Sequence, residues 1–147
     1  MGAVKLLFVV QRPPYKSENP RLALTHALAS QTAEIYMDDG DSVVPTVAFV
    51  GDGVLNALKG QLAMKTYGVT STESHIKGCL MTDVPIWVCK EDMERLGLKE
   101  DQIVSDAEDM GGAEIATKFV SFADIQKEME SVKHLLFFER LTPCSIR

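Results

Sequence analysis

The chain has 147 residues, 46% hydrophobic and 24% charged, a composition that predicts one globular domain over residues 1–147 with a sizeable core. Its net charge of -6 and pI near 5.0 argue against direct nucleic-acid binding, which needs clustered Lys and Arg for the phosphates. No apolar run is long enough for a membrane span and no signal-type segment begins the chain, so we expect a cytoplasmic protein without membrane contact.

The N-terminal part of the chain has the pattern of a buried strand followed by a helix. An apolar run at residues 4–10 predicts the strand, and the loop that follows it contains two prolines. Asn19 and Pro20 have the pattern of an N-cap and a first helical residue, which predicts a helix to about residue 34. The residues that we expect on its inner side are Leu22, Leu24, Ala27 and Leu28.

The rest of the chain continues this alternation of strands and helices. Strands separated by helix-length segments imply a parallel sheet, because parallel neighbours need crossover connections. We therefore predict an α/β fold, a flavodoxin-like three-layer domain with a five-stranded, mainly parallel sheet and helices on both faces. The further strands are expected at residues 43–50, 84–88, 115–120 and 134–138. The further helices are expected at residues 54–58, 70–82 and 90–96, and a last helix is expected to begin after its N-cap Ser121 and to end at residue 132.

Cys89 lies where a predicted strand ends and a predicted helix begins. Met93 and Leu96 follow it at four and seven residues, a helical spacing, and Gly97 is placed to end this helix. At a helix start, unpaired backbone N–H groups and the positive end of the helix dipole favour the thiolate, which is the nucleophilic form of cysteine. Cys89 is therefore a candidate nucleophile.

The expected activation of Cys89 is moderate. A helix dipole contributes roughly 0.3 to 1 kcal/mol at an exposed site, which is less than one pKa unit. Lys90 acts in the same direction, but three acids in the same helix oppose it, so we expect a moderately reactive thiol. The alternative is a structural cysteine that is buried as a small hydrophobic residue. The three acids are Glu91, Asp92 and Glu94.

Two loops are expected to meet Cys89, because ligands and chemistry gather beyond the carboxyl ends of parallel strands. They are the loop over residues 11–19 and the loop at residues 51–53, whose glycines permit a tight turn. Turn and packing roles remain an alternative for all of these residues. The candidate cleft-lining residues are Tyr15, Gly51, Asp52, Gly53 and Lys90.

The cysteines and histidines predict no metal site. Three cysteines, an odd number, fit free thiols in a reducing compartment, and the chain has no CxxC pair and only scattered histidines. Cys79 is expected to be buried in a helix. Cys144 lies in a predicted flexible tail over residues 140–147, where it is either a resolving thiol or inert.

Four segments, in order along most of the chain, resemble the DsrE/DsrF-like family, whose members include sulfur-relay subunits and small stand-alone homologues. The first is Pro14-Tyr15 after the first strand. The chain departs from the family pattern in the three acids beside Cys89 and in Cys144, which is not part of the relay motif. The other matching segments are FVGDGVLNALKGQ at 49–61, VCKEDMERLGL at 88–98 and ATKFVSFADIQKEMESVKHLLFF at 116–138.

This resemblance implies a sulfur-relay protein in which Cys89 carries sulfane sulfur as a persulfide and passes it to a partner thiol. Such exchange needs no metal and no organic cofactor. The implied partners are sulfur donor and acceptor proteins, in a homo-oligomer, trimer or hexamer, or in a hetero-oligomer with related subunits. The alternative is a non-catalytic assembly or regulatory module of the same fold.

Cys89 and Arg95 also have the C-x5-R spacing of cysteine phosphatases. A phosphate cradle needs small residues and positive potential, whereas the intervening KEDME segment carries three negative charges. We therefore do not expect phosphatase chemistry.

Overall fold

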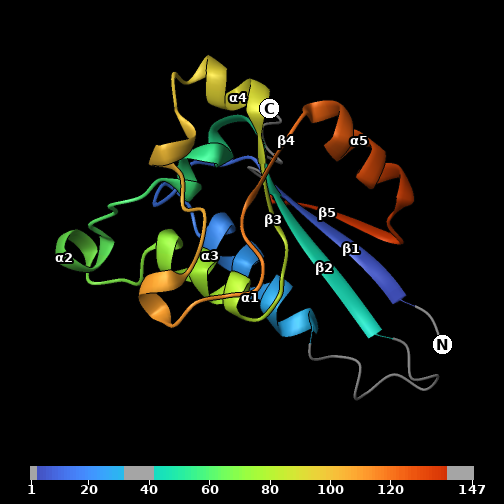
Figure 1. The fold of residues 1–147 in the computed structure, drawn as a ribbon, viewed down its shortest axis with the longest axis horizontal. Coiled ribbons are helices and arrows are strands. Elements are labelled where there is room, and N and C mark those ends of the chain that lie inside the picture. Colours follow the sequence, from blue (N-terminus) through green and yellow to red (C-terminus); the bar gives the residue numbers. More distant parts are fainter. Residues whose placement is uncertain (1–2, 32–41, 139–147) are drawn as a thin grey trace, which may run out of the picture.

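A computed structural model describes residues 3–31 and 42–138. Its strands form one five-stranded sheet in the order β4-β3-β2-β1-β5, and every pairing is parallel. The predicted α/β fold with a mainly parallel sheet is thus confirmed (Figure 1). The strands are β1 (Ala3–Val10), β2 (Ser42–Phe49), β3 (Ile86–Cys89), β4 (Lys118–Val120) and β5 (His134–Phe138).

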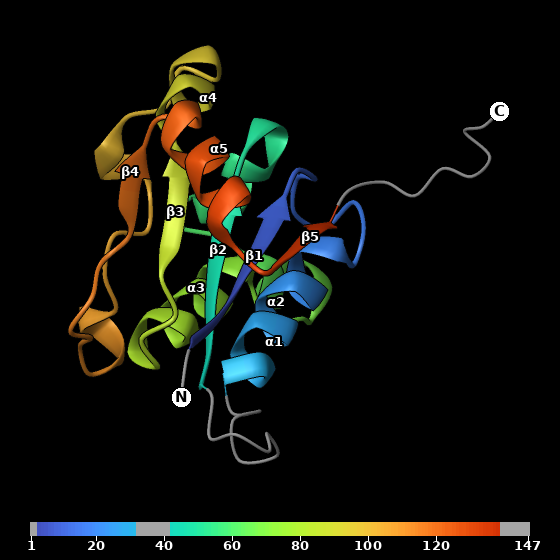
Figure 2. The ribbon, with the colours of Figure 1, turned by 90° about the vertical axis from the view of Figure 1, so that its right-hand side faces the viewer.

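The strand order explains the layers of the molecule. From β1 to β4 each strand lies beside the previous one in the chain, so right-handed crossovers place their helices on one face. The connection from β4 to β5 runs back across the sheet, and its helix α5 lies on the opposite face (Figures 1 and 2). The α-helices are α1 (Asn19–Gln31), α2 (Ala63–Tyr67), α3 (Thr72–Met81), α4 (Lys90–Arg95) and α5 (Phe122–Ser131). The 3-10 helices are η2 (Gly51–Ala57), η3 (Glu100–Gln102) and η4 (Glu108–Met110).

The core occupies both faces of the central strands, because alternate residues of a buried parallel strand point to opposite faces. Val9, Ala48 and Trp87 are register partners across β1, β2 and β3, so they share a face. Leu6 and Phe8, on the other face of β1, line a hollow with His26 of α1, so the face with Val9 is the one that α5 covers. Ile125 of α5 is fully buried. Cys89 lies two residues after Trp87 and shares the same face.

The inner face of α1 differs from the prediction. Leu22 and Leu28 are 43% and 36% exposed, so their expected inward orientation was wrong. A helix buries positions three and four residues apart, and the buried stripe here contains shorter side chains than we had assumed. The buried residues of α1 are Pro20, Ala23, Leu24 and Ala27.

Several element boundaries also differ from the sequence predictions. The helix predicted at 54–58 is a 3-10 helix, η2, that begins three residues earlier, at Gly51. Helix α2 was not predicted, and the strand predicted at 115–120 is shorter, Lys118–Val120. The predicted end of the first helix beyond residue 31 and the predicted tail at 140–147 lie outside the described residues. Among the helices of residues 3–31 and 42–138, none has the length and apolar character needed to cross a membrane.

Candidate functional site

Cys89 is the last residue of β3 and the N-cap residue of α4, which begins at Lys90. Its backbone is extended, with φ -73° and ψ 121°, so the chain turns from strand to helix directly after it. The side chain has no exposed surface. The structure therefore places Cys89 at the predicted strand end, but beneath its neighbours rather than in an open cleft.

Glu91 and the start of α5 lie beside the Cys89 sulfur. The Sγ atom of Cys89 is 3.6 Å from Glu91 Oε1, a distance at which the thiol donates to the carboxylate. The same oxygen accepts a hydrogen bond of 2.9 Å from the backbone N–H of Phe122, the first residue of α5. This N–H lowers the pKa of Glu91 and keeps the carboxylate charged. One carboxylate thus connects α4 to α5 next to the thiol.

The Cys89 thiol is a weaker acid than an ordinary cysteine. Burial raises the pKa of Cys89 to about 11, and the nearby Asp92 carboxylate acts in the same direction. The backbone N–H groups of Asp92 and Glu91 lower the pKa, as expected at a helix start, but burial outweighs them. The sequence predicted a moderately reactive thiol. In this conformation Cys89 is instead protonated at neutral pH.

Asp92 ties the loop after β2 to α4. Its Oδ2 atom accepts a hydrogen bond of 2.6 Å from the Gly51 N–H, and its Oδ1 atom lies 3.2 Å from Arg95 Nε. Arg95 also contacts Asp52 Oδ1 at 3.3 Å. Burial raises the pKa of Asp92, but the Gly51 and Arg95 hydrogen bonds lower it overall. The Arg95 guanidinium is held by two carboxylates, which is unlike the anion-binding role of a phosphatase arginine.

Gly53 lets this loop approach β1 closely. A Cβ atom at this position would lie 2.0 Å from the backbone oxygen of Val10 and 2.7 Å from its carbonyl carbon. Gly51 has a different requirement, because its φ of +56° lies in the left-handed region. The two glycines therefore set the path of the loop that carries Asp52 toward Arg95.

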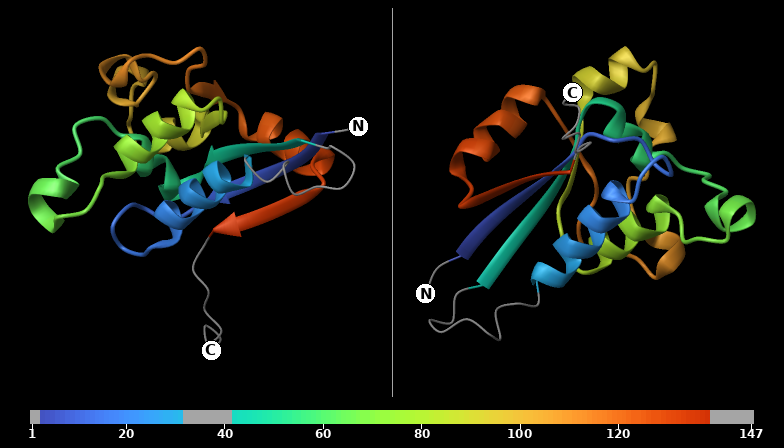
Figure 3. Two further views of the ribbon diagram at one scale, coloured as in Figure 1. Left: turned by 90° about the horizontal axis from the view of Figure 1, so that it is seen from below. Right: turned by 180° about the vertical axis from the view of Figure 1, so that it is seen from behind.

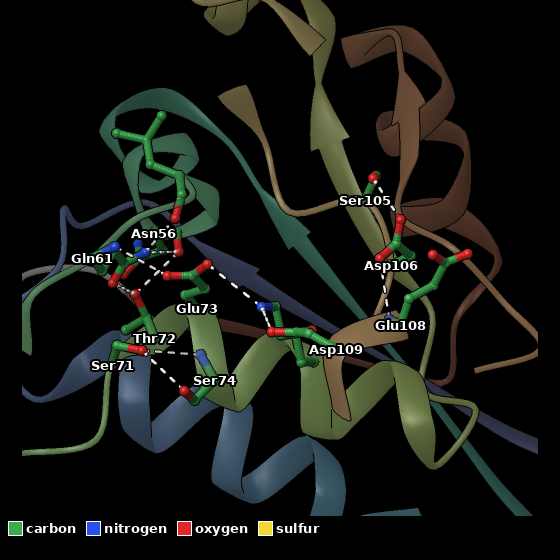
Figure 4. Close-up of polar contacts among 12 residues, drawn as sticks. Asn56, Gln61, Ser71, Thr72, Glu73, Ser74, Ser105, Asp106, Glu108 and Asp109 are labelled. Carbon is green, nitrogen blue, oxygen red and sulfur yellow. Dashed lines mark hydrogen bonds and ion pairs between the residues drawn. The ribbon is translucent and has the colours of Figure 1, made fainter. Parts of the chain in front are cut away.

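Tyr15 belongs to a polar network at the start of α3. Its hydroxyl donates to Gln61 Oε1 and accepts a hydrogen bond of 3.1 Å from the Thr72 N–H. The hydroxyl of Thr72 lies 3.0 Å from the Asn56 carbonyl oxygen and 2.8 Å from Gln61 Oε1 (Figure 4). These contacts stabilise the joint between η2 and α3 and involve no atom of Cys89.

Within the described residues, neither Lys90 nor Cys79 hydrogen-bonds to the Cys89 sulfur. The Lys90 side chain is exposed and lines a shallow hollow of about 380 Å³ with residues of α4 and the following loop. Cys79 is 1% exposed in α3, and burial raises its pKa to about 12, so it has the environment of an inert structural cysteine. Cys144 lies outside the described residues.

Two contacts of the site were missed in the sequence. Glu91 was read only as a charge that opposes ionisation, and Phe122 was not singled out. The one available signal was an acid two residues after the cysteine, at the start of a helix. Its partner is the Phe122 N–H, 31 positions away in the sequence.

Comparison with known proteins identifies the family. The model of the DsrE/DsrF-like family matches residues 4–126. The chain belongs to the DsrE/DsrF-like family. A curated relative, "Protein TusC homolog" of Aliivibrio fischeri, is 30% identical to this DsrE/DsrF-like chain over 118 residues, which cover 78% of this chain and 90% of the relative.

Solved structures show the same fold. The YchN protein from E. coli superposes with a TM-score of 0.64 at 18% identity, covering 92% of this chain and 99% of YchN. MTH1491 from Methanobacterium thermoautotrophicum, a protein of unknown function, gives a TM-score of 0.55 at 15% identity and covers 89% and 96% of the two chains. At these identities the likeness concerns the fold of the DsrE/DsrF-like chain alone.

Proposed function

We propose that this DsrE/DsrF-like chain works in sulfur relay and that Cys89 carries sulfane sulfur as a persulfide. The family and the relative named as a TusC homologue support the general role. The observation that carries the finer proposal is the position of Cys89 at the carboxyl end of β3, where the backbone N–H groups of Glu91 and Asp92 favour a negative charge on sulfur.

The transfer is a pair of thiol exchanges that needs no oxidant. The Cys89 thiolate attacks the terminal sulfur of a donor persulfide, the donor S–S bond breaks, and the donor leaves as a thiolate. An acceptor thiolate then attacks the terminal sulfur on Cys89, and Cys89 leaves as a thiolate. The Glu91 and Asp92 N–H groups stabilise that leaving thiolate.

The buried position of Cys89 implies that docking of the donor opens the site. In the resting chain the sulfur is covered and its pKa is raised to about 11. Displacement of the Glu91 carboxylate from the Phe122 N–H moves a negative charge away from the thiol. Phe122, with 43% of its surface exposed, offers a donor protein an apolar contact at this position.

Persulfide mapping tests the proposal. The full chain is incubated with a persulfidated donor protein, unreacted thiols are blocked, and the added sulfur is located by peptide mass spectrometry. We expect loading on Cys89 in the wild type and in Cys79→Ser, and none at this position in Cys89→Ser. Equal total loading of wild type and Cys89→Ser would reject the carrier role.

A second candidate function is a non-catalytic subunit of a sulfur-relay assembly. The complete burial and raised pKa of Cys89 favour it, because both are typical of a structural cysteine. In that case Cys89→Ser would leave the sulfur flux of the assembly unchanged. Either function is proposed for an oligomer of this chain, a trimer or hexamer, or for a hetero-oligomer with related subunits, and light scattering reports its mass.

A further inference from the structure

The three most exposed large hydrophobic side chains of the described residues lie within one short segment. Leu62, Met64 and Tyr67 are 65%, 63% and 63% exposed, whereas no other large hydrophobic residue in the described ranges exceeds 49%. They belong to α2 and its N-cap position, and Ala63 is the only buried residue of this helix. Helix α2 projects from the body of the domain on the side away from α5 and β5 (Figures 1 and 3). Apolar side chains that gather in one exposed place mark an interaction surface.

Tyr67 is held in place by Tyr15, from the loop that follows β1. The centroids of the two rings are 5.7 Å apart, and the ring planes form an angle of 38°. Tyr15 is itself fixed, because its hydroxyl donates to Gln61 Oε1 and accepts a hydrogen bond from the Thr72 N–H. Tyr67 thus rests on an ordered neighbour while most of its surface stays open to solvent. An exposed tyrosine that is already ordered loses little conformational entropy on binding, which suits it as an anchor for a partner.

The segments that build this side of the molecule contain no acidic residue. All 21 Asp and Glu residues lie outside residues 6–17 and 53–72, in a chain with a net charge of -6. Lys65 of α2 and Lys16 of the loop after β1 are exposed, and neither has an ion pair within the part of the chain that the structure describes. The buried Nε atom of Arg12, in the same loop, has no hydrogen-bond partner among the described residues. This side is therefore a positive, apolar surface on a negatively charged protein.

The acids that follow the two segments in the sequence are paired with other cations. Glu18 Oε2 lies 3.4 Å from Arg21 Nη1, and Glu73 Oε2 lies 3.6 Å from Lys77 Nζ. Lys59 does not belong to the surface, because it lines a hollow together with acidic residues of the loop before β4. Within the described ranges, the charges of Lys16 and Lys65 are thus left without a matching carboxylate.

We propose that the α2 surface, formed by Leu62, Met64, Lys65 and Tyr67 with Lys16, docks an acidic segment of a partner protein. The two lysines select carboxylates by charge complementarity, and the segment presents an aromatic or aliphatic side chain to Tyr67. Tyrosine and methionine are enriched where protein interfaces are buried, and methionine adapts its shape to apolar neighbours. Two exposed lysines provide too little charge for a nucleic-acid backbone, which needs clustered Lys and Arg.

Selection from a random peptide library displayed on phage tests the proposal, with the full chain as the target. We expect the enriched peptides to combine several Asp or Glu residues with at least one aromatic or large aliphatic residue. Enrichment of basic or uncharged peptides, or no enrichment, would overturn the proposal. The inference goes beyond the proposed function, because docking needs no reaction at Cys89. A Cys89→Ser chain should therefore enrich the same peptides, so loss of sulfur transfer and loss of docking are separate results.

Surface variants then show which side chains bind an enriched peptide, with fluorescence anisotropy as the measurement of Kd. Tyr67→Ala should raise Kd by about tenfold or more, as for an anchor residue, and Lys65→Glu by about threefold or more through like-charge repulsion. The matched controls are Phe137→Ala on β5 and Lys127→Glu on α5, which are exposed on the other side of the molecule and should leave Kd unchanged. Equal effects of the variants and their controls would contradict the proposal.

A charge exchange separates recognition from a general loss of structure. The same peptide with Lys in place of its acids should bind the double variant K16E/K65E more tightly than it binds the wild type, and the reverse order would overturn the proposal. Two further measurements test other occupants. A decrease in the mass of the assembly in Tyr67→Ala, by sedimentation equilibrium, would assign the surface to a second copy of the chain. Binding of a single-stranded oligonucleotide more tightly than the peptide, and its loss in K16E/K65E, would assign the surface to nucleic acid; either result would overturn the proposal.

Discussion

Gly53→Ala is expected to destabilise the protein strongly, because the added Cβ would meet backbone rather than a flexible side chain. The Cβ position lies 2.0 Å from the Val10 backbone oxygen, so the loop after β2 or the end of β1 must move by more than about 1 Å to reach ordinary contact distance. The same oxygen accepts a hydrogen bond of 3.1 Å from the Val50 N–H. The movement therefore also breaks a contact that joins β1 to β2.

The magnitude follows from these two effects. Overpacking costs about 1–3 kcal/mol and the lost hydrogen bond about 1 kcal/mol, so Gly53→Ala should lower the free energy of unfolding by about 2–4 kcal/mol. For a chain of this length that corresponds to a decrease of roughly 5–15 °C in Tm. Urea denaturation followed by circular dichroism measures the change.

Two other glycines supply controls. Gly78, in α3, has no atom within 4 Å of its Cβ position, so Gly78→Ala should stabilise the protein by about 0.5–1 kcal/mol through helix propensity. Gly51 also has open space but a φ of +56°, so Gly51→Ala should cost about 1 kcal/mol from backbone strain alone. A Gly53→Ala protein within about 0.5 kcal/mol of the wild type would refute the argument from close approach.

Two further predictions concern titratable groups at the site. Asp92→Asn should lower the free energy of unfolding at pH 7 by about 1–2 kcal/mol, because the carboxylate accepts from the Gly51 N–H and from Arg95. The pKa of Asp92 is lowered from 3.8, so its contribution to the free energy of unfolding is present above that pH and is lost as pH falls through the lowered value. A difference in the free energy of unfolding between wild type and Asp92→Asn that did not shrink in acid would contradict this. The folded chain binds the Cys89 proton more tightly than the unfolded chain, because its pKa is raised from 9.0 to about 11, so the free energy of unfolding should fall as pH rises from about 9 to about 11. In a urea series, Cys89→Ala should make that decline less steep, and the remainder comes from Cys79, whose pKa burial raises to about 12; an unchanged slope would contradict the raised pKa of Cys89.

The fold was accessible from the sequence because local patterns agree with it. Apolar runs separated by helix-length segments predict a parallel sheet, and the strand-to-helix change at Cys89 is visible in the residues on either side of it. Leu22 and Leu28 show where this reasoning fails. Hydrophobic residues on a helix were assumed to point inward, while the sheet packs against the smaller residues Ala23 and Ala27.

The burial of Cys89 was one of two alternatives that the sequence left open, and the contacts beside its sulfur decide between them only in the folded chain. It depends on α5 crossing back over the sheet, which places the Phe122 N–H beside Glu91 although the two residues are far apart in the chain. The position of Tyr15 has a similar cause. Its φ of +67° and its hydrogen bond with Thr72 direct the ring toward α3, and neither feature has a local sequence signal.

The most direct test of the central claim is a single-turnover transfer experiment with radiolabelled sulfur. The full chain is loaded from a labelled donor persulfide, separated from the donor, and then mixed with an acceptor thiol protein. We predict that the label resides on Cys89 after loading and moves to the acceptor, while the Cys89→Ser chain transfers none. Label that remains on the chain, or that reaches the acceptor equally from wild type and Cys89→Ser, would contradict a carrier role for Cys89.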